Sequence, residues 1–381
     1  MKKKIQCIIF IFVLIFSFLF VLIGCNNNEN STFNCDNCGS LIDESSKFCS
    51  QCGEKIGDTP NNNNNNNNNN IGKCEHNWVP ATCFSSKTCS KCGEIEGDIL
   101  KHSYDNGSCK SCGATEGLYY VSSNNGYSVS IGTAINISSI VIPSYHNGLP
   151  VTSIAEEAFS FSSSLVSITI PDSVTTIGKN AFYCCSALTN LKMGNSITSI
   201  GDYAFYECNR LISIIIPDSV TSIGEWAFAK CTSIKSVNIP DSVTYLGKDA
   251  FFCCTSLTIV IIGNGVSRVR DFTFYGCEAL GKVTIGNSVT SIDSCAFWEC
   301  YSLKNVTIPN SVTNIGSSAF QECRSLEEVR LGNNIKNIGE RAFCDCNRLK
   351  NVYYNGTMKQ WGEIIIALYN EPLISATFIY K

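Results

Sequence analysis

The chain has 381 residues, of which 16% are charged and 44% hydrophobic, and its formal net charge is −4. This length is enough for two or three domains, and the absence of a basic excess argues against nucleic acid as a partner. Only three histidines are present, which argues against histidine-based catalysis. Cysteine is abundant, with 24 residues that divide evenly between the stretch before residue 113 and the stretch after residue 183.

Residues 1–25 have the pattern of an export signal. Three lysines at positions 2–4 precede an uncharged apolar stretch, which ends in Leu22-Ile23-Gly24-Cys25. This ending resembles the lipobox of bacterial lipoproteins, and the resemblance implies that Cys25 carries a lipid and becomes the mature N-terminus. The alternative is an uncleaved N-terminal helix. Both interpretations place residues 26 onward, beginning with a 26–34 spacer, outside the cytoplasm at the cell surface.

A first cysteine module occupies residues 35–56. It contains two Cys-x2-Cys pairs, each followed by glycine, and its four cysteines are Cys35, Cys38, Cys49 and Cys52. The glycine allows the tight turn that brings two thiolates to one metal, and four thiolates make a closed structural zinc site with no open position for water. The stretch resembles a prokaryotic zinc ribbon. The alternative is two disulfides, because the module lies outside the cytoplasm.

A second module follows an asparagine-rich linker. Residues 57–72 include an uninterrupted asparagine tract at 61–70, which has nothing apolar to bury and which we interpret as a flexible tether. Residues 73–117 then offer enough ligands for two tetrahedral zinc sites: Cys74, His76, Cys83, Cys89, Cys92, His102, Cys109 and Cys112. Either the two Cys-x2-Cys pairs form a second ribbon and the other four ligands a separate site, or each site mixes the two sets. Disulfides with exposed histidines are the alternative.

The rest of the chain is one repeat. Phenylalanine recurs every 23 residues at positions 159, 182, 205, 228, 251, 274, 297, 320 and 343. Cysteine follows three residues later in eight of these units, and leucine or isoleucine follows six residues later. Each unit then reads L-x-x-I-x-I, as in Leu165-x-x-Ile168-x-Ile170, and this alternation is typical of a short strand with one face inward.

This unit closely resembles the BspA-like leucine-rich repeat, I-P-D-S-V-T-x-I-G-x-x-A-F-x-x-C-x-x-L. We therefore predict a β-solenoid over residues 118–381, with a parallel sheet of ten strands between Ile142 and Tyr354 and a short helical turn at Ala181-Phe182. Caps are expected at residues 118–130 and 354–380. Arg270 and Asp293 stand where the other coils have glycine, which predicts a different bend there.

The stacked positions show no sign of catalysis. An Asp/Asn column begins at Asp172 and Asn195, and turn capping explains it better than calcium binding does. The repeated cysteines are expected to be reduced and packed in the core. Ser–His, Cys–His and H-E-x-x-H arrangements and phosphate-binding loops are missing from the sequence. We predict neither enzymatic activity nor a small-molecule substrate.

Function is therefore expected on the outward positions of the strands. Most of these are small and polar, but Ile215, Ile259 and Ile261 are apolar, with Ile212 beside them. Exposed apolar clusters often mark interaction sites, although β-branched residues also simply favour strands. We predict this patch as the contact for a macromolecular partner, a host or bacterial protein.

Together these features predict a surface-anchored, non-enzymatic binding protein with structural zinc in its stalk. The resemblance to BspA-like proteins implies adhesion to host or bacterial surfaces, and the lipid would hold the protein at the membrane. The alternative is a structural scaffold or assembly subunit of the bacterial cell envelope without a foreign ligand. Metal sensing by the stalk is a third, more distant interpretation.

Overall fold

The structure is a computed structural model that describes residues 102–123 and 125–381, together with residue 81 and the short segments 32–34, 41–43, 78–79, 87–90 and 95–96. The chain forms two compact units, residues 1–73 and 74–381. In the first unit, β1 (Thr32–Asn34) pairs antiparallel with β2 (Leu41–Asp43). Outside the described residues lie the predicted lipid site Cys25 and the predicted linker 57–72. The four predicted ligands of the first module also lie outside them: Cys35, Cys38, Cys49 and Cys52.

The second unit begins with small antiparallel sheets in the region of the second Cys/His module. Strands β3 (Trp78–Val79), β4 (Lys87–Cys89) and β5 (Ile95–Glu96) form one of them. A hairpin of β6 (Tyr104–Asp105) and β7 (Ser108–Cys109) forms the other. Within the described part of the chain, no helix is long and apolar enough to cross a membrane.

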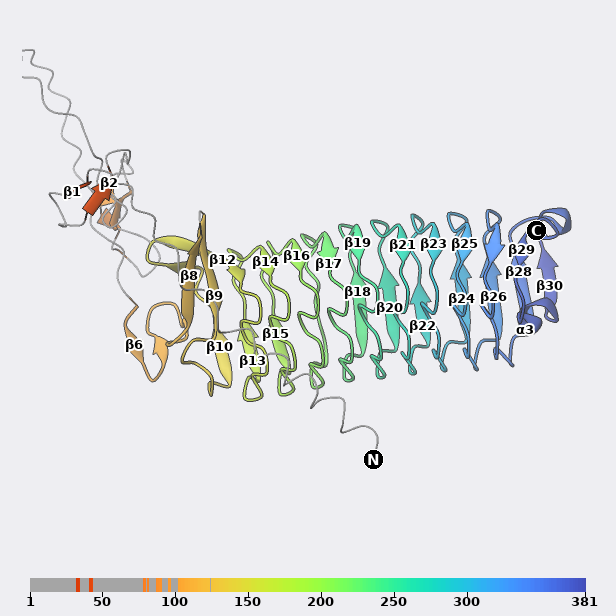
Figure 1. The fold of residues 1–381 in the computed structure, drawn as a ribbon, viewed down its shortest axis with the longest axis horizontal. Coiled ribbons are helices and arrows are strands. Elements are labelled where there is room, and N and C mark those ends of the chain that lie inside the picture. The colour runs from red at the N-terminus through yellow and green to blue at the C-terminus, as the bar shows by residue number, and fades with distance from the viewer. Residues whose placement is uncertain are drawn as a thin grey trace, which may run out of the picture. The chain divides into compact units, whose positions relative to one another are not determined.

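Residues 118–381 form a β-solenoid of about 11 turns with a repeat of about 23 residues, as predicted. Its strands form two parallel ladders (Figure 1). The ladder built from the L-x-x-I-x-I segments, called the front sheet here, consists of β10 (Ser139–Val141), β13 (Ser167–Thr169), β15 (Asn190–Lys192), β18 (Ser236–Ile239), β20 (Ile259–Ile262), β22 (Lys282–Thr284), β24 (Asn305–Ile308), β26 (Glu328–Leu331), β28 (Asn351–Tyr354) and β30 (Thr377–Tyr380).

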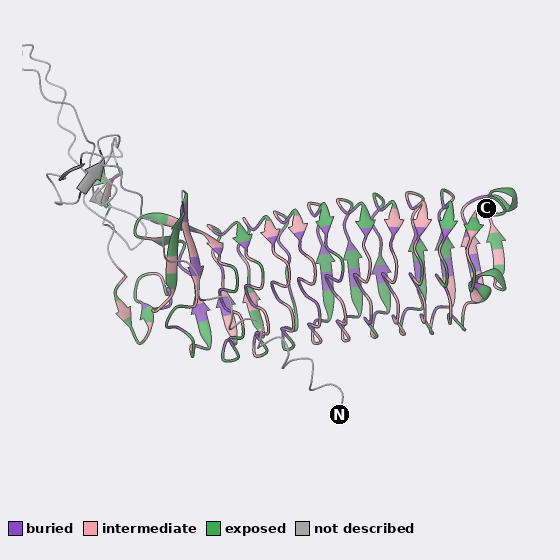
Figure 2. Cartoon of the chain, in the orientation of Figure 1, coloured by how far each residue is buried: buried purple, intermediate pink, exposed green. Residues whose placement is uncertain are grey.

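The other ladder, called the back sheet here, is made mostly of two-residue strands. It contains β12 (Leu149–Ile154), β14 (Thr176–Ile177), β16 (Ser199–Ile200), β17 (Ser222–Ile223), β19 (Tyr245–Leu246), β21 (Arg268–Val269), β23 (Ser291–Ile292), β25 (Asn314–Ile315), β27 (Asn337–Ile338) and β29 (Ile365–Ile366). In both sheets buried and exposed residues alternate along the strands, which places the core between them (Figure 2).

The core is a column of identical side chains. All nine repeated phenylalanines are fully buried. Neighbouring rings stack with centroids 5.0–5.5 Å apart and planes within 3–12° of parallel. Because each ring contacts the equivalent ring of the next coil, the 23-residue spacing sets the register of the whole array.

The repeated cysteines have a role beyond packing. Each thiol donates a hydrogen bond, at a sulfur–oxygen distance of 3.0–3.5 Å, to the backbone carbonyl of the phenylalanine 26 residues earlier. Cys254, for example, donates to the carbonyl of Phe228 in the preceding coil. The Phe228 carbonyl also accepts the Cys231 amide of its own coil at 3.3 Å, so the thiol adds a second hydrogen bond that links neighbouring coils.

The predicted helical turn at Ala181-Phe182 is wrong. Residues two before and two after the phenylalanine have left-handed backbone angles, as at Asn180 (φ 54°) and Cys184 (φ 57°). This alternation lets every second amide point along the solenoid axis, so Phe182 N donates to Ala204 O at 2.7 Å and Cys184 N to Tyr206 O at 2.8 Å. The only α-helices in the described residues are the four-residue α2 (Met358–Trp361) and α3 (Glu371–Ile374).

One of the ten predicted strands does not form. Residues 211–216 have no strand geometry, and the front sheet is interrupted between β15 and β18. The inward residues Leu191, in β15, and Met193, just after it, are only half-buried, whereas the matching residues of the other coils through β28 are buried. The interruption of the ladder therefore coincides with the least buried inward positions of these coils.

The missing glycine at position 270 also interrupts a sheet. A Cβ on Gly247, at the same corner, would lie 2.5 Å from the Glu225 nitrogen of the preceding coil, so the close approach at that coil requires glycine. At Arg270 the coil is separated from the preceding coil, and the back sheet divides between β19 and β21. The Arg270 guanidinium lies 4.8 Å from the centre of the Tyr245 ring, across this division.

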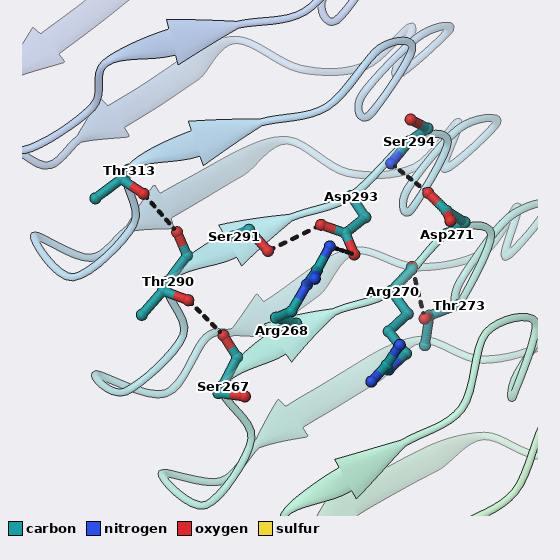
Figure 3. A network of polar contacts seen from close by, with 10 residues as sticks. All are labelled: Ser267, Arg268, Arg270, Asp271, Thr273, Thr290, Ser291, Asp293, Ser294 and Thr313. Atoms are coloured by element: carbon teal, nitrogen blue, oxygen red, sulfur yellow. Dashed lines mark hydrogen bonds and ion pairs between the residues drawn. The ribbon is translucent and has the colours of Figure 1, made fainter.

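The second exception, Asp293, is held by a polar network (Figure 3). Its carboxylate accepts hydrogen bonds from Arg268 at 2.9 Å and from the Ser291 hydroxyl at 2.8 Å. The Asp293 amide still donates to Val269 O at 2.7 Å. The predicted change of geometry is therefore found at Arg270, while Asp293 keeps the regular ladder.

Elements that differ from the 23-residue repeat cover both ends of the solenoid. At the N-terminal end, the hairpin of β8 (Tyr119–Ser123) and β9 (Gly126–Ser130) pairs with β12, and β11 (Tyr145–His146) also pairs with β12. At the C-terminal end, α2 begins with a capping box between Thr357 and Gln360, and Trp361 packs 4.5 Å from Phe378.

We predict that Phe251→Ala destabilises the solenoid by ~3–5 kcal/mol, the usual effect of truncating a buried phenylalanine. Phe251 stacks on rings on both sides, whereas Phe159 stacks on Phe182 alone, so Phe251→Ala should also broaden the urea unfolding transition more than Phe159→Ala. Phe161→Ala, at a residue that is 67% exposed, is the control. Equal effects of Phe251→Ala and Phe161→Ala would contradict the stacked core.

The thiol column predicts a loss of stability at alkaline pH. Burial raises the pKa of the Cys185 thiol from 9.0 to about 12, and it raises those of Cys208 and Cys254 as well. Above pH 9 only the unfolded chain releases these protons, so each thiol lowers the free energy of unfolding by about 1.4 kcal/mol per pH unit. Urea denaturation between pH 8 and pH ~10.5 measures this slope. Cys254→Ala should reduce this pH dependence by the contribution of one thiol. An unchanged pH dependence would refute its assignment to the buried thiols.

Candidate functional site

The predicted isoleucine patch lies on the outward face of the front sheet. Ile215 is 83% exposed, Ile259 41% and Ile261 44%, and the neighbouring Ile212 is also exposed. Ile259 and Ile261 lie in β20, where they pair with Ser236 and Asn238 of β18. Ile215 lies in the segment without strand geometry, so the patch crosses the interruption of the sheet.

A hollow that the sequence did not reveal lies further along the same face. It has a volume of about 930 Å³ and spans β22 to β30. Its lining includes the outward residues Lys282, Thr284, Thr307, Arg330 and Tyr353. In this stretch, which the structure describes completely, no backbone hydrogen bond joins β22 to β24. The inward residues Val283 and Ile285 line the hollow and are 9% and 7% exposed, so the coils separate there.

The hollow has a positive lining. Lys282, Arg330 and Lys381 line it, together with four asparagines and no acidic residue. The Arg330 guanidinium lies 4.1 Å from the centre of the Tyr353 ring and 3.7 Å from the Glu328 carboxylate. These contacts hold the guanidinium against the sheet while leaving half of its side chain exposed to a ligand.

A smaller hollow of about 430 Å³ has the opposite charge. Asp218 and Asp241 line it together with Asn238 and Ile261 of the predicted patch. The front sheet therefore carries an acidic, partly apolar region around β18 and β20 and a basic region from β22 onward.

The solenoid's only histidine is used in packing. His146 stacks on Tyr120 with ring centroids 3.8 Å apart and meets Tyr127 edge-on at 4.9 Å. Burial lowers its pKa, and the nearby His102 lowers it further. The ring therefore joins β11 to the hairpin of the N-terminal cap, which is a structural use.

Three of the predicted metal ligands come together in the second Cys/His module. The ligating atoms of His102, Cys109 and Cys112 all lie within 4.8 Å of one another, and Cys112 Sγ is 3.5 Å from His102 Nδ1. This grouping joins a histidine to one Cys-x2-Cys pair, so it favours the mixed assignment of ligands over two separate sets. Cys89 is buried in β4, and the remaining four ligands lie outside the described residues: Cys74, His76, Cys83 and Cys92.

The residues present fit a zinc ion. Burial alone would raise the pKa of the Cys109 thiol, but hydrogen bonds from His102 and from the backbone at Cys112 and Ser111 outweigh it and lower the pKa to about 6. A thiolate and a neutral imidazole are the ligands that zinc prefers. His102 Nε2 is buried without a hydrogen-bond partner among the described residues, which leaves this ring nitrogen without the usual polar contact.

Comparison with known proteins places the chain in a family. Residues 132–258 and 244–368 match the BspA type leucine rich repeat region, and residues 31–56 match a zinc-ribbon domain. The repeat matches cover more than half of the chain, so the protein belongs to the BspA-type leucine-rich repeat family. Leucine-rich repeat proteins of this kind are typically non-enzymatic. No curated protein matches the chain.

Several solved structures are similar to this chain. A leucine-rich repeat protein of T. pallidum is 28% identical over 55% of this chain and 88% of its own, with a TM-score of 0.47. One from Bacteroides ovatus ATCC 8483 is 25% identical over 70% of this chain and 78% of its own, with a TM-score of 0.47. A leucine rich cell surface protein from Faecalibacterium prausnitzii A2-165 is 24% identical over 68% of this chain and 98% of its own, with a TM-score of 0.28.

Proposed function

We propose that this protein is a surface-displayed, non-enzymatic binding protein that recognises another protein through its front sheet. The observation that carries the proposal is the basic hollow across β22 to β30, which lies on the same face as the exposed isoleucine patch. Exposed apolar clusters rimmed by polar residues often mark protein interaction sites.

The solenoid supports this role mechanically. Its phenylalanine column is fully buried along the whole array, and inter-coil hydrogen bonds continue through the turns even where a sheet is interrupted. The outward side chains are therefore held on a rigid frame, and little conformational entropy is lost when a partner binds.

The N-terminal segments account for the display at the cell surface. In our proposal a lipid on Cys25 holds the protein at the membrane, and the two cysteine modules form a stalk that contains structural zinc. The zinc-ribbon match at residues 31–56 supports the metal in the first module, and the grouping of His102, Cys109 and Cys112 supports it in the second.

The binding proposal predicts the effect of two paired substitutions. Ile259→Asp with Ile261→Asp adds charge to the patch, and Lys282→Ala with Arg330→Ala removes the positive charge from the hollow. Because all four side chains face solvent, each double variant should keep a near-native melting temperature but bind its partner at least ~100-fold more weakly. The partner is first isolated from host-matrix and cell-envelope extracts, and its affinity is then measured by calorimetry.

A back-sheet variant provides the control. Thr290→Asp changes an exposed residue just before β23 of the back sheet and should leave the affinity unchanged. Full affinity in both folded double variants would remove the front sheet as the contact. A partner found only in the protein's own envelope fraction would favour the scaffold interpretation over adhesion.

The anchor proposal has its own test. The full chain should partition into the detergent phase and incorporate a fatty-acid analogue when it is expressed in a bacterial host, because Cys25 accepts the lipid. Cys25→Ser should abolish that incorporation, whereas Cys35→Ser should not affect it. Unchanged labelling of Cys25→Ser would show that the N-terminal segment is not a lipoprotein signal.

A further inference from the structure

The first strand of the front sheet is capped by a residue of the second Cys/His module. On one side β10 pairs with β13. On the other side Val141 exchanges two hydrogen bonds with Thr115: Thr115 N donates to Val141 O at 2.9 Å, and Val141 N donates to the Thr115 hydroxyl at 2.8 Å. Thr115 is only 3% exposed, so it acts as a one-residue extension of the sheet.

Short-range contacts tie Thr115 to the cluster of His102, Cys109 and Cys112. Thr115 is three residues beyond Cys112 and forms an antiparallel bridge with Ser108, the neighbour of Cys109. Cys109 N donates to Ala114 O at 2.8 Å, and Gly113 N donates to Cys109 O at 2.8 Å. The loop that holds the two thiols therefore also positions the capping residue.

The cluster has the dimensions of a metal site. With zinc–sulfur and zinc–nitrogen distances of about 2.3 and 2.0 Å in a tetrahedron, sulfur and nitrogen ligands lie about 3.5 Å apart. The separation of Cys112 Sγ from His102 Nδ1 is 3.5 Å. Cys109 is buried against Ala114, with Tyr104 packed beside them, so the site is partly shielded from water.

We propose that zinc bound by His102, Cys109 and Cys112 closes the N-terminal edge of the front sheet, so that metal occupancy controls the capping of the solenoid. The hairpin of β8 and β9 covers the start of the back sheet, and the metal loop covers the start of the front sheet. This inference does not depend on the proposed binding function.

The physical basis is that an unpaired strand edge exposes backbone hydrogen-bonding groups, which can pair with another chain. The outer edge of β10 would otherwise present the Val141 amide and carbonyl to solvent or to another chain, and repeat arrays require capped ends for solubility. The 102–116 loop contributes only a small buried cluster of its own, Cys109 and Ala114. Its other contacts are backbone hydrogen bonds, and bound metal would add a cross-link that holds the loop in this arrangement.

Hydrogen exchange of the Val141 amide in the full chain tests the proposal, because this amide bonds directly to Thr115. Removing zinc with a chelator should speed exchange at Val141 by about tenfold or more, while exchange at Val260 in the middle of the array stays unchanged. Cys109→Ser with Cys112→Ser should have the same effect and lower the zinc content by one equivalent.

Two further variants distinguish the effect of zinc at this cap from the effect of zinc bound in the first module. Cys35→Ser with Cys38→Ser should also lose one zinc equivalent but leave Val141 exchange unchanged. Thr115→Val should retain all the zinc yet speed exchange at Val141, because it removes the acceptor hydroxyl and keeps the side-chain shape. Unchanged Val141 exchange after chelation, or an unchanged zinc content in Cys109→Ser with Cys112→Ser, would overturn the proposal.

Discussion

The stacking of each coil on an identical copy of itself is the constraint on which the rest of the structure depends. A buried phenylalanine contacts the same ring of the next coil, and a thiol of the following coil donates a hydrogen bond to that phenylalanine's carbonyl. Neither contact exists within a single coil, so no coil can be stable alone. Register, spacing and the direction of every outward side chain follow from this repeated contact.

The individual features of the molecule arise where the repetition is imperfect. The front sheet is interrupted beside Ile215, next to the half-buried Leu191 and Met193, and the back sheet is interrupted at Arg270. A third break, between β22 and β24, coincides with the basic hollow. The breaks in the front sheet thus adjoin the two surface features that a partner could use. The core tolerates them because the turns remain hydrogen-bonded from coil to coil.

Much of the fold could be predicted because identical residues repeat at one spacing. Phe159 and its equivalents define the period, and Leu165-x-x-Ile168-x-Ile170 defines the strand. The alternating left-handed angles around Phe182 could not be predicted, because residues such as Tyr203 and Trp226 carry no conformational signal for them. The exposed isoleucines could be named from alternation, but the hollow depends on how far β22 and β24 separate. The use of Thr115 as a cap depends on a tertiary contact that leaves no local pattern.

The central claim, that the front sheet is the recognition surface, is tested most directly by site-specific photocrosslinking. A benzophenone side chain is placed at Thr307, in the hollow, or at Thr290, which is exposed beside the back sheet. Both proteins are irradiated with cell-envelope and host-matrix fractions. The account predicts that one defined partner is captured from Thr307 and none from Thr290. Capture from Thr290 with none from Thr307 would contradict it.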